Sequence, residues 1–300
     1  MPEANVVGVE IGSLVRLDQM TAPGTVYVLR ESAVRSPPGQ TNPTTCGELI
    51  ATDPQQKTDK TLTQNIDYFV ANGIAQNIGQ TKPTVLAITG CGSQALLTYA
   101  LGVSSASCGT DWDVTKGNLK AEVVQLNTTF GVATNSSLPV QLFQMSTALD
   151  AFKGPTGRLS VTFGDLAPDA GAAPQDVDAG ALFAPGPQTN LAVKQTDNAM
   201  YGSHGFRVVA GPANAPFTLD ESLAAVQELS SPRELPTSYY RAASNYALLL
   251  LGDPSHTPSF ADGGVNPLYN PRQAVHILAV PVIDPAALDA GTNDGGGGGT

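Results

Sequence analysis

The three cysteines carry the most evident chemistry in this 300-residue chain: Cys46, Cys91 and Cys108. They form no C-x-x-C pair and no histidine lies near them in sequence, so the spacing does not indicate a zinc site. Cys91 and Cys108 each precede a glycine. A disulfide between them would contribute about 3 kcal/mol through loop closure. Pairing of Cys46 with either one is the alternative.

A disulfide predicts export from the reducing cytosol, whereas three reduced thiols would fit a cytosolic protein. The odd number of cysteines predicts either a free thiol or a missing partner. A lipid-modified cysteine preceding Met1 would account for it, so an N-terminal lipid anchor in the native protein is one interpretation.

An acidic segment between Asp111 and Glu122 resembles a calcium-binding loop in its spacing. Asp111, Asp113 and Glu122 stand at positions 1, 3 and 12 of such a loop, with Thr115 at position 5. The glycine needed at position 6 is one place late, at Gly117. The pattern therefore favours a turn, and calcium is the alternative.

A second acidic loop offers the same choice near the C-terminus. Asp253, Asp262 and Asn266 could bind calcium together with backbone carbonyls, or form turns by bonding their own backbone. Calcium is the one cofactor that the sequence suggests, and otherwise none is expected.

Aromatic residues in loop-like segments are candidates for stacking on sugar rings, although such residues more often cover the edge of a core. They are Trp112, Tyr201, Tyr239, Tyr240 and Tyr269.

Motifs for nucleophilic catalysis are missing from the sequence. There is no G-x-S-x-G motif, and the three histidines (His204, His256 and His276) have no evident carboxylate and serine partners. Cys91 between two glycines has no adjacent base to activate it. The sequence therefore predicts a protein that is not an enzyme.

Composition argues against nucleic acid as a partner and against a segment that spans a bilayer. The net charge is −11 and the 15 basic residues are scattered, which argues against nucleic-acid binding. The longest apolar run, 246–251, has six residues and is too short to span a bilayer. Many turn formers (31 Gly and 23 Pro) and only 14% charged residues indicate short strands joined by turns.

Hydrophobic periodicity predicts strands over 26–29, 85–88, 119–126, 138–145, 158–163, 206–209, 246–251 and 276–282. It predicts helices over 60–79, 148–157 and 220–229, and the composition of 166–189 predicts a long flexible loop. We expect a mainly β protein of two tandem β-sandwich modules, Ig-like or transthyretin-like, each with a short helix. The modules would cover 1–155 and 156–285, followed by a disordered glycine-rich tail over 286–300.

The C-terminal segment resembles a known group. The run Tyr246–Pro254, the loop 261–267 and the strand 274–279 are similar to the end of Ig-like repeats in uncharacterised, myxobacterial-type cell-surface lipoproteins. The resemblance covers about residues 158–285, with Arg158–Pro168 as the opening strand. It implies a β-sandwich fold and an envelope location, and no catalytic activity.

Together these features predict an exported protein of the periplasm, outer-membrane surface or extracellular space. Its role would be interaction, adhesion or structure, with a protein or surface glycan as partner. The alternative is a secreted hydrolase of polysaccharide or peptide whose site is assembled only in three dimensions.

Overall fold

A computed structural model gives the fold of the chain in two compact units. The first comprises Met1–Glu10, Met20–Asn77 and Leu86–Val123, and the second comprises Ile11–Gln19, Ile78–Val85 and Val124–Thr300. The residues that the structure describes are 24–29, 50, 62–65, 67–74, 84–93, 111–126, 137–152, 159–166, 173–192, 204–211, 214, 216–223, 225–226, 245–259, 263–267, 269 and 273–282.

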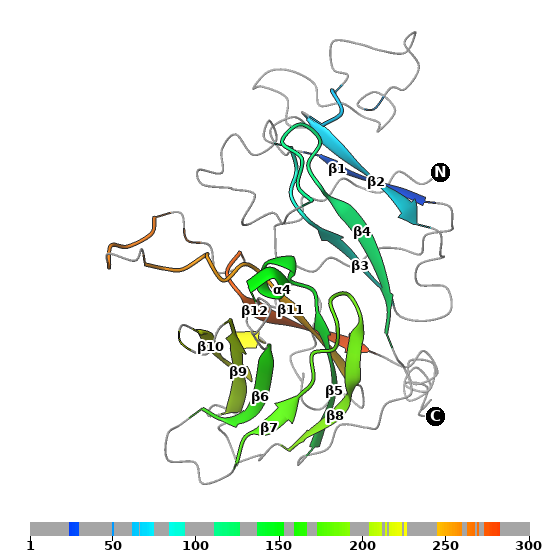
Figure 1. Cartoon of the computed structure of the whole chain (residues 1–300). Helices are drawn as coiled ribbons and strands as arrows, with labels where there is room; N and C mark the ends of the chain where they lie inside the picture. Colours follow the sequence, from blue (N-terminus) through cyan, green and yellow to red (C-terminus); the bar gives the residue numbers. More distant parts are fainter. Residues whose placement is uncertain are drawn as a thin grey trace, which may run out of the picture. The chain divides into compact units, whose positions relative to one another are not determined.

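Two short two-stranded sheets lie before residue 126 (Figure 1). Strand β1 (Gly24–Leu29) pairs antiparallel with β2 (Tyr68–Ile74), and β3 (Thr84–Thr89) pairs with β4 (Lys120–Gln125). The rings of Tyr27 and Tyr68 lie across β1 and β2 with centroids 6.1 Å apart. The strands predicted at 26–29, 85–88 and 119–126 are thus confirmed.

The helix predicted over 60–79 is wrong, because β2 occupies its second half. A tight turn precedes the strand: Asn65 has a φ of 63° and its N–H donates to the Tyr68 carbonyl. The Asp67 carboxylate accepts from the Thr63 N–H at 2.9 Å, a local hydrogen bond between side chain and backbone within this turn. The helical spacing of Ile66, Phe69 and Val70 was therefore outweighed by local turn formation and by pairing with β1.

The second unit contains two four-stranded sheets (Figure 1). One has the order β12-β11-β5-β8, in which β5 and β11 are parallel and the other pairs antiparallel. The other has the antiparallel order β10-β9-β6-β7. Their bounds are Ser137–Gln144 (β5), Ser160–Asp165 (β6), Gln175–Val177 (β7), Pro185–Ala192 (β8), His204–Ala210 (β9), Phe217–Ser222 (β10), Asn245–Leu251 (β11) and His276–Val282 (β12). A short helix, α4 (Thr147–Phe152), follows β5.

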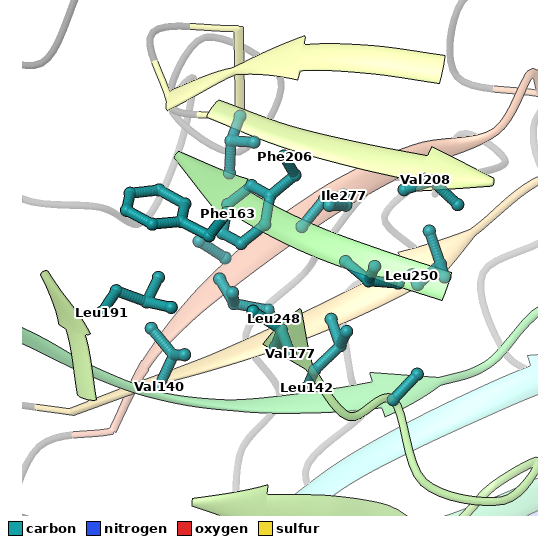
Figure 2. Packing of buried hydrophobic residues seen from close by; sticks show 14 of the residues in the cluster. Val140, Leu142, Phe163, Val177, Leu191, Phe206, Val208, Leu248, Leu250 and Ile277 are labelled. Carbon is teal, nitrogen blue, oxygen red and sulfur yellow. The ribbon is translucent and has the colours of Figure 1, made fainter. Parts of the chain in front are cut away.

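The two sheets share one apolar core. Alternate residues of β5, β9 and β11 point into the space between the two sheets, as the labelled side chains in Figure 2 show. Leu142 and Leu248 come from one sheet and Phe163 and Phe206 from the other, and each is at most 1% exposed. The Phe163 and Phe206 ring centroids lie 5.1 Å apart. The prediction of a mainly β fold is confirmed, while the Ig-like or transthyretin-like type of the modules stays a prediction.

The boundary between the two parts of the chain lies earlier in the sequence than the position predicted for it. The expected boundary was residue 155, but β5 pairs with β8 and β11, both beyond that point. The last boundary between the two units falls between Val123 and Val124. The strand over 138–145 is confirmed, yet its periodicity carried no information about which strands it would join.

The predicted loop over 166–189 is wrong in part, because β7 and β8 lie within or across it. Both are edge strands, where proline is tolerated because no outward N–H is needed. A Cβ on Gly186 would collide with the Asp178 carbonyl oxygen, so glycine permits a close backbone approach there. The proline and glycine content that indicated a loop is therefore compatible with two edge strands.

The two helices predicted within the second unit agree with the structure only in part. The helix predicted over 148–157 is confirmed in its first part as α4. Ser146 caps it, since its hydroxyl accepts from the Leu149 N–H at 3.0 Å and donates to the Gly252 carbonyl. The helix predicted over 220–229 begins late: Asp220–Ser222 belong to β10, and the described helical residues are Leu223, Ala225 and Val226.

Candidate functional site

The Cys91 turn, residues 90–93, is bound to the loop 111–118 in the first unit. The Asn118 N–H donates to the Cys91 carbonyl, and the Cys91 N–H donates to the Asn118 side-chain oxygen, both at 2.8 Å. Gly90 and Gly117 have φ values of 87° and 70°, and a Cβ on either would collide with backbone of the other segment. The two segments can therefore approach closely only because glycine stands at both positions.

Cys91 itself is disulfide-bonded. Both of its predicted partners, Cys108 and the alternative Cys46, lie outside the described residues, so the connectivity stays a prediction. The sulfur and both backbone polar groups of Cys91 are thus engaged. This arrangement favours a structural role for Cys91 over that of a nucleophile.

The candidate calcium loop at Asp111, Asp113 and Glu122 is occupied by protein donors. Asp113 accepts from the Thr115 N–H (2.8 Å) and hydroxyl (2.6 Å) and from the Lys116 N–H (2.9 Å). These hydrogen bonds, that of the Thr115 side chain first, lower the pKa of the Asp113 carboxyl. The interpretation that the sequence favours for this segment, a turn at Gly117, is the one that these bonds support.

The other two carboxylates of that set point to different partners. Asp111 accepts from the Asn118 side-chain amide at 2.9 Å, and Glu122 lies 3.7 Å from the Lys120 ammonium. Within the described ranges, no three His, Cys, Asp or Glu side chains gather in a group that could hold a metal ion.

The second candidate calcium loop follows β11. Asp253 accepts from the Ser255 N–H (2.8 Å) and hydroxyl (2.7 Å), again as a turn former. The Asn266 amide donates to the Thr257 carbonyl at 3.1 Å, and Ser259 and Val265 form a β-bridge. Asp262 lies outside the described residues. We call residues 252–275 the β11–β12 loop.

The described aromatic residues that are candidates for stacking on sugars lie in different loops. The Trp112 indole N–H donates to the Gly92 carbonyl at 2.8 Å, so its polar edge helps to hold the Cys91 turn. Tyr269 is half-buried in the β11–β12 loop, where its N–H donates to the Asn266 carbonyl. Tyr201 and Tyr239 lie outside the described residues, as does Tyr240. Stacking of these rings on a sugar stays a prediction.

The three histidines lie on different elements. His204 opens β9 and its ring contacts Phe163, while His256 stands in the β11–β12 loop. His276 opens β12, is 2% exposed and has its Nδ1 2.7 Å from the Ala274 carbonyl. Buried and bonded to local backbone, His276 fits the structural role favoured over that of a catalytic base.

Sequence reasoning missed the most unusual titratable group, Glu221 on β10. This carboxyl is 6% exposed, and its Oε2 accepts from the Ile277 N–H at 2.8 Å. Burial raises its pKa to about 8, although the Ile277 N–H opposes the rise. A signal was present: Phe217, Leu219, Glu221 and Leu223 alternate, which places the glutamate on the inward face. A helical interpretation of 220–229 conceals this phase, because a helix and a strand place different residues on one face.

A second polar side chain, that of Gln175, bridges the two sheets at their other edges, β7 and β8. The Gln175 side-chain amide on β7 donates to the Asn190 carbonyl at 2.8 Å. Its carbonyl oxygen accepts from the Ala192 N–H at 3.1 Å. Both partners lie on β8, the edge strand of the other sheet. Gln175 and Glu221 thus each supply the backbone of an edge strand with hydrogen-bond partners.

Comparisons with protein families, with curated proteins and with solved structures find no match for this chain. Across the described part of the chain, no helix combines the length and apolar character needed for a membrane crossing.

Proposed function

We propose that this chain is a non-catalytic, exported protein of the cell envelope or cell surface. Its role is interaction, adhesion or structure, with a protein or surface glycan as partner. The disulfide at Cys91 supports export, because such bonds persist outside the reducing cytosol. The acidic charge of −11 supports a soluble, exposed surface.

The observation that carries the interaction role is the β11–β12 loop. Its turn at Asp253 and its bridge between Ser259 and Val265 give the loop its own internal bonds. It connects two strands whose inward residues lie in the apolar core. Its Val265 side chain is nevertheless 80% exposed. A loop fixed on a rigid scaffold and presenting an apolar side chain is typical of binding surfaces.

A glycan array, probed with and without calcium, tests the adhesive form of this proposal. Val265→Asp should weaken binding at least about tenfold by placing a charge at the contact (1.4 kcal/mol per factor of ten). Val114→Asp is the matched control, because Val114 is 55% exposed in the other loop, 111–118. Binding that survives Val265→Asp would remove the loop from the proposal, and an array without binding would contradict glycan adhesion.

Mass spectrometry under non-reducing conditions tests export. One disulfide among the three cysteines is expected, with peptide mapping to identify the partner of Cys91. Three free thiols would contradict the exported location. No feature of the described residues favours the alternative of a secreted hydrolase.

A further inference from the structure

Glu221 joins the edge strands of the two sheets. β10 ends one sheet and β12 ends the other, and the two strands do not pair with each other. The Glu221 carboxyl spans from β10 to the backbone N–H of Ile277 on β12. We call this hydrogen bond the Glu221 latch. The carboxyl belongs to the inward face of β10, where Glu221 is opposite Phe206 of β9.

The surroundings of the latch are apolar. Phe206, Ile277, Leu223 and Val226 all belong to the shared core and are fully buried. Burial raises the Glu221 pKa, and the hydrogen bond from the Ile277 N–H only partly opposes this rise. The carboxyl is therefore held as the neutral acid over much of the range in which glutamate is normally ionised.

The titratable groups on the strands around the latch lie either on the opposite face of their strand or at another position along it than Glu221 and its partner. Asp220, the neighbour of Glu221 on β10, is on the outer face and pairs with Arg207 of β9 at 2.6 Å. His276 precedes Ile277 on β12 and so points to the opposite face of that strand. His204 stands at the start of β9, opposite Asp165 of β6.

We propose that the Glu221 latch is a proton-dependent closure between the two sheets. As the neutral acid, Glu221 holds β12 against the β10 edge, and loss of the proton releases this edge to water. The charged carboxylate needs hydration that the closed core does not supply. Water reaches it when β12 separates locally from β10, so deprotonation shifts the equilibrium toward the open edge.

Native-state hydrogen exchange at the Ile277 amide tests the proposal on the full chain. Rates corrected for intrinsic exchange give the equilibrium constant for opening. In the wild type it should rise by up to about tenfold per pH unit between about pH 5 and about pH 8. Low denaturant should leave this opening almost unchanged, because a local opening exposes little surface.

Two variants separate the latch from other effects. Glu221→Gln keeps the shape and an acceptor for Ile277 but cannot ionise, so its opening should lose the pH dependence. Asp220→Asn removes the adjacent carboxyl on the outer face and should behave as the wild type. Should Glu221→Gln fold poorly, the ¹³C carboxyl shift of Glu221 in the wild type must show a carboxyl that stays protonated until about pH 8, the pH at which the rise in opening levels off.

Two results would overturn the proposal. In the first, Ile277 exchanges only with the denaturant dependence of global unfolding, so that no local opening exists. In the second, its local opening is independent of pH or retains its pH dependence in Glu221→Gln.

Discussion

The strongest prediction for the whole molecule is that Glu221→Gln stabilises it at neutral pH. The Glu221 pKa rises from the ordinary 4.5 to about 8 on folding. The folded state therefore binds the proton more tightly than the unfolded state. Stability from this group is complete below about pH 4.5, falls as pH rises, and is lost above about pH 8.

The magnitude follows from the size of the shift. Each pKa unit corresponds to about 1.4 kcal/mol, so the full shift lowers the free energy of unfolding by up to about 5 kcal/mol. At pH 7 the loss is about 3 kcal/mol. A neutral glutamine in the same place avoids this loss and can still accept from the Ile277 N–H.

Urea unfolding of both proteins at several pH values measures the difference directly. The two should be similar near pH 4 and diverge steadily toward pH 8.5, with the variant more stable. Subtracting the curves removes the other titrating groups, which both proteins share. Parallel curves, or a variant that is less stable at pH 8, would show that Glu221 is hydrated in the folded state and would refute the reasoning.

Three further changes test the fold around this core by thermal or urea unfolding. Ser146→Ala should cost about 1–3 kcal/mol, because it removes the cap of α4 and the donor to the Gly252 carbonyl; no loss would mean that the cap is not used. Gly252→Ala should destabilise clearly more than Gly263→Ala: both have positive φ (93° and 84°), but only at Gly252 would the Cβ meet neighbouring backbone. Equal losses would assign the effect to φ alone. Gln175→Ala should cost about 1 kcal/mol and promote association through the uncovered edge of β8, visible by light scattering; a monomer of unchanged stability would contradict the edge-covering role.

Strand positions were predictable where alternation or an apolar run was strong. The runs at 246–251 and 276–282 became β11 and β12, since buried strands leave a continuous apolar signature. The order of strands was not predictable. The parallel pairing of β5 with β11 joins segments about a hundred residues apart, and nothing local in either strand encodes that contact.

In the candidate site, too, only the interactions between residues close in sequence were predictable. The turn chemistry of Asp113 and Asp253 was visible in the sequence because these carboxylates bond within two or three residues of themselves. The role of Trp112 was not visible, since its partner Gly92 is 20 residues away. Glu221 is the extreme case: its partner Ile277 is 56 residues away, and its burial depends on a sheet that its own segment does not form.

The two bridging side chains explain why the choice of residue at each edge matters. Gln175 offers a donor and an acceptor, and β8 presents a carbonyl and an N–H to match them. Neither of these two hydrogen bonds involves a group that ionises. At the other edge β12 presents an N–H to Glu221, which an amide oxygen could accept equally well. A carboxyl in that position adds no hydrogen bond that glutamine would lack, yet it makes stability depend on pH. The distinguishing property of Glu221 is therefore its proton, which is why both the latch and the stability test compare it with glutamine.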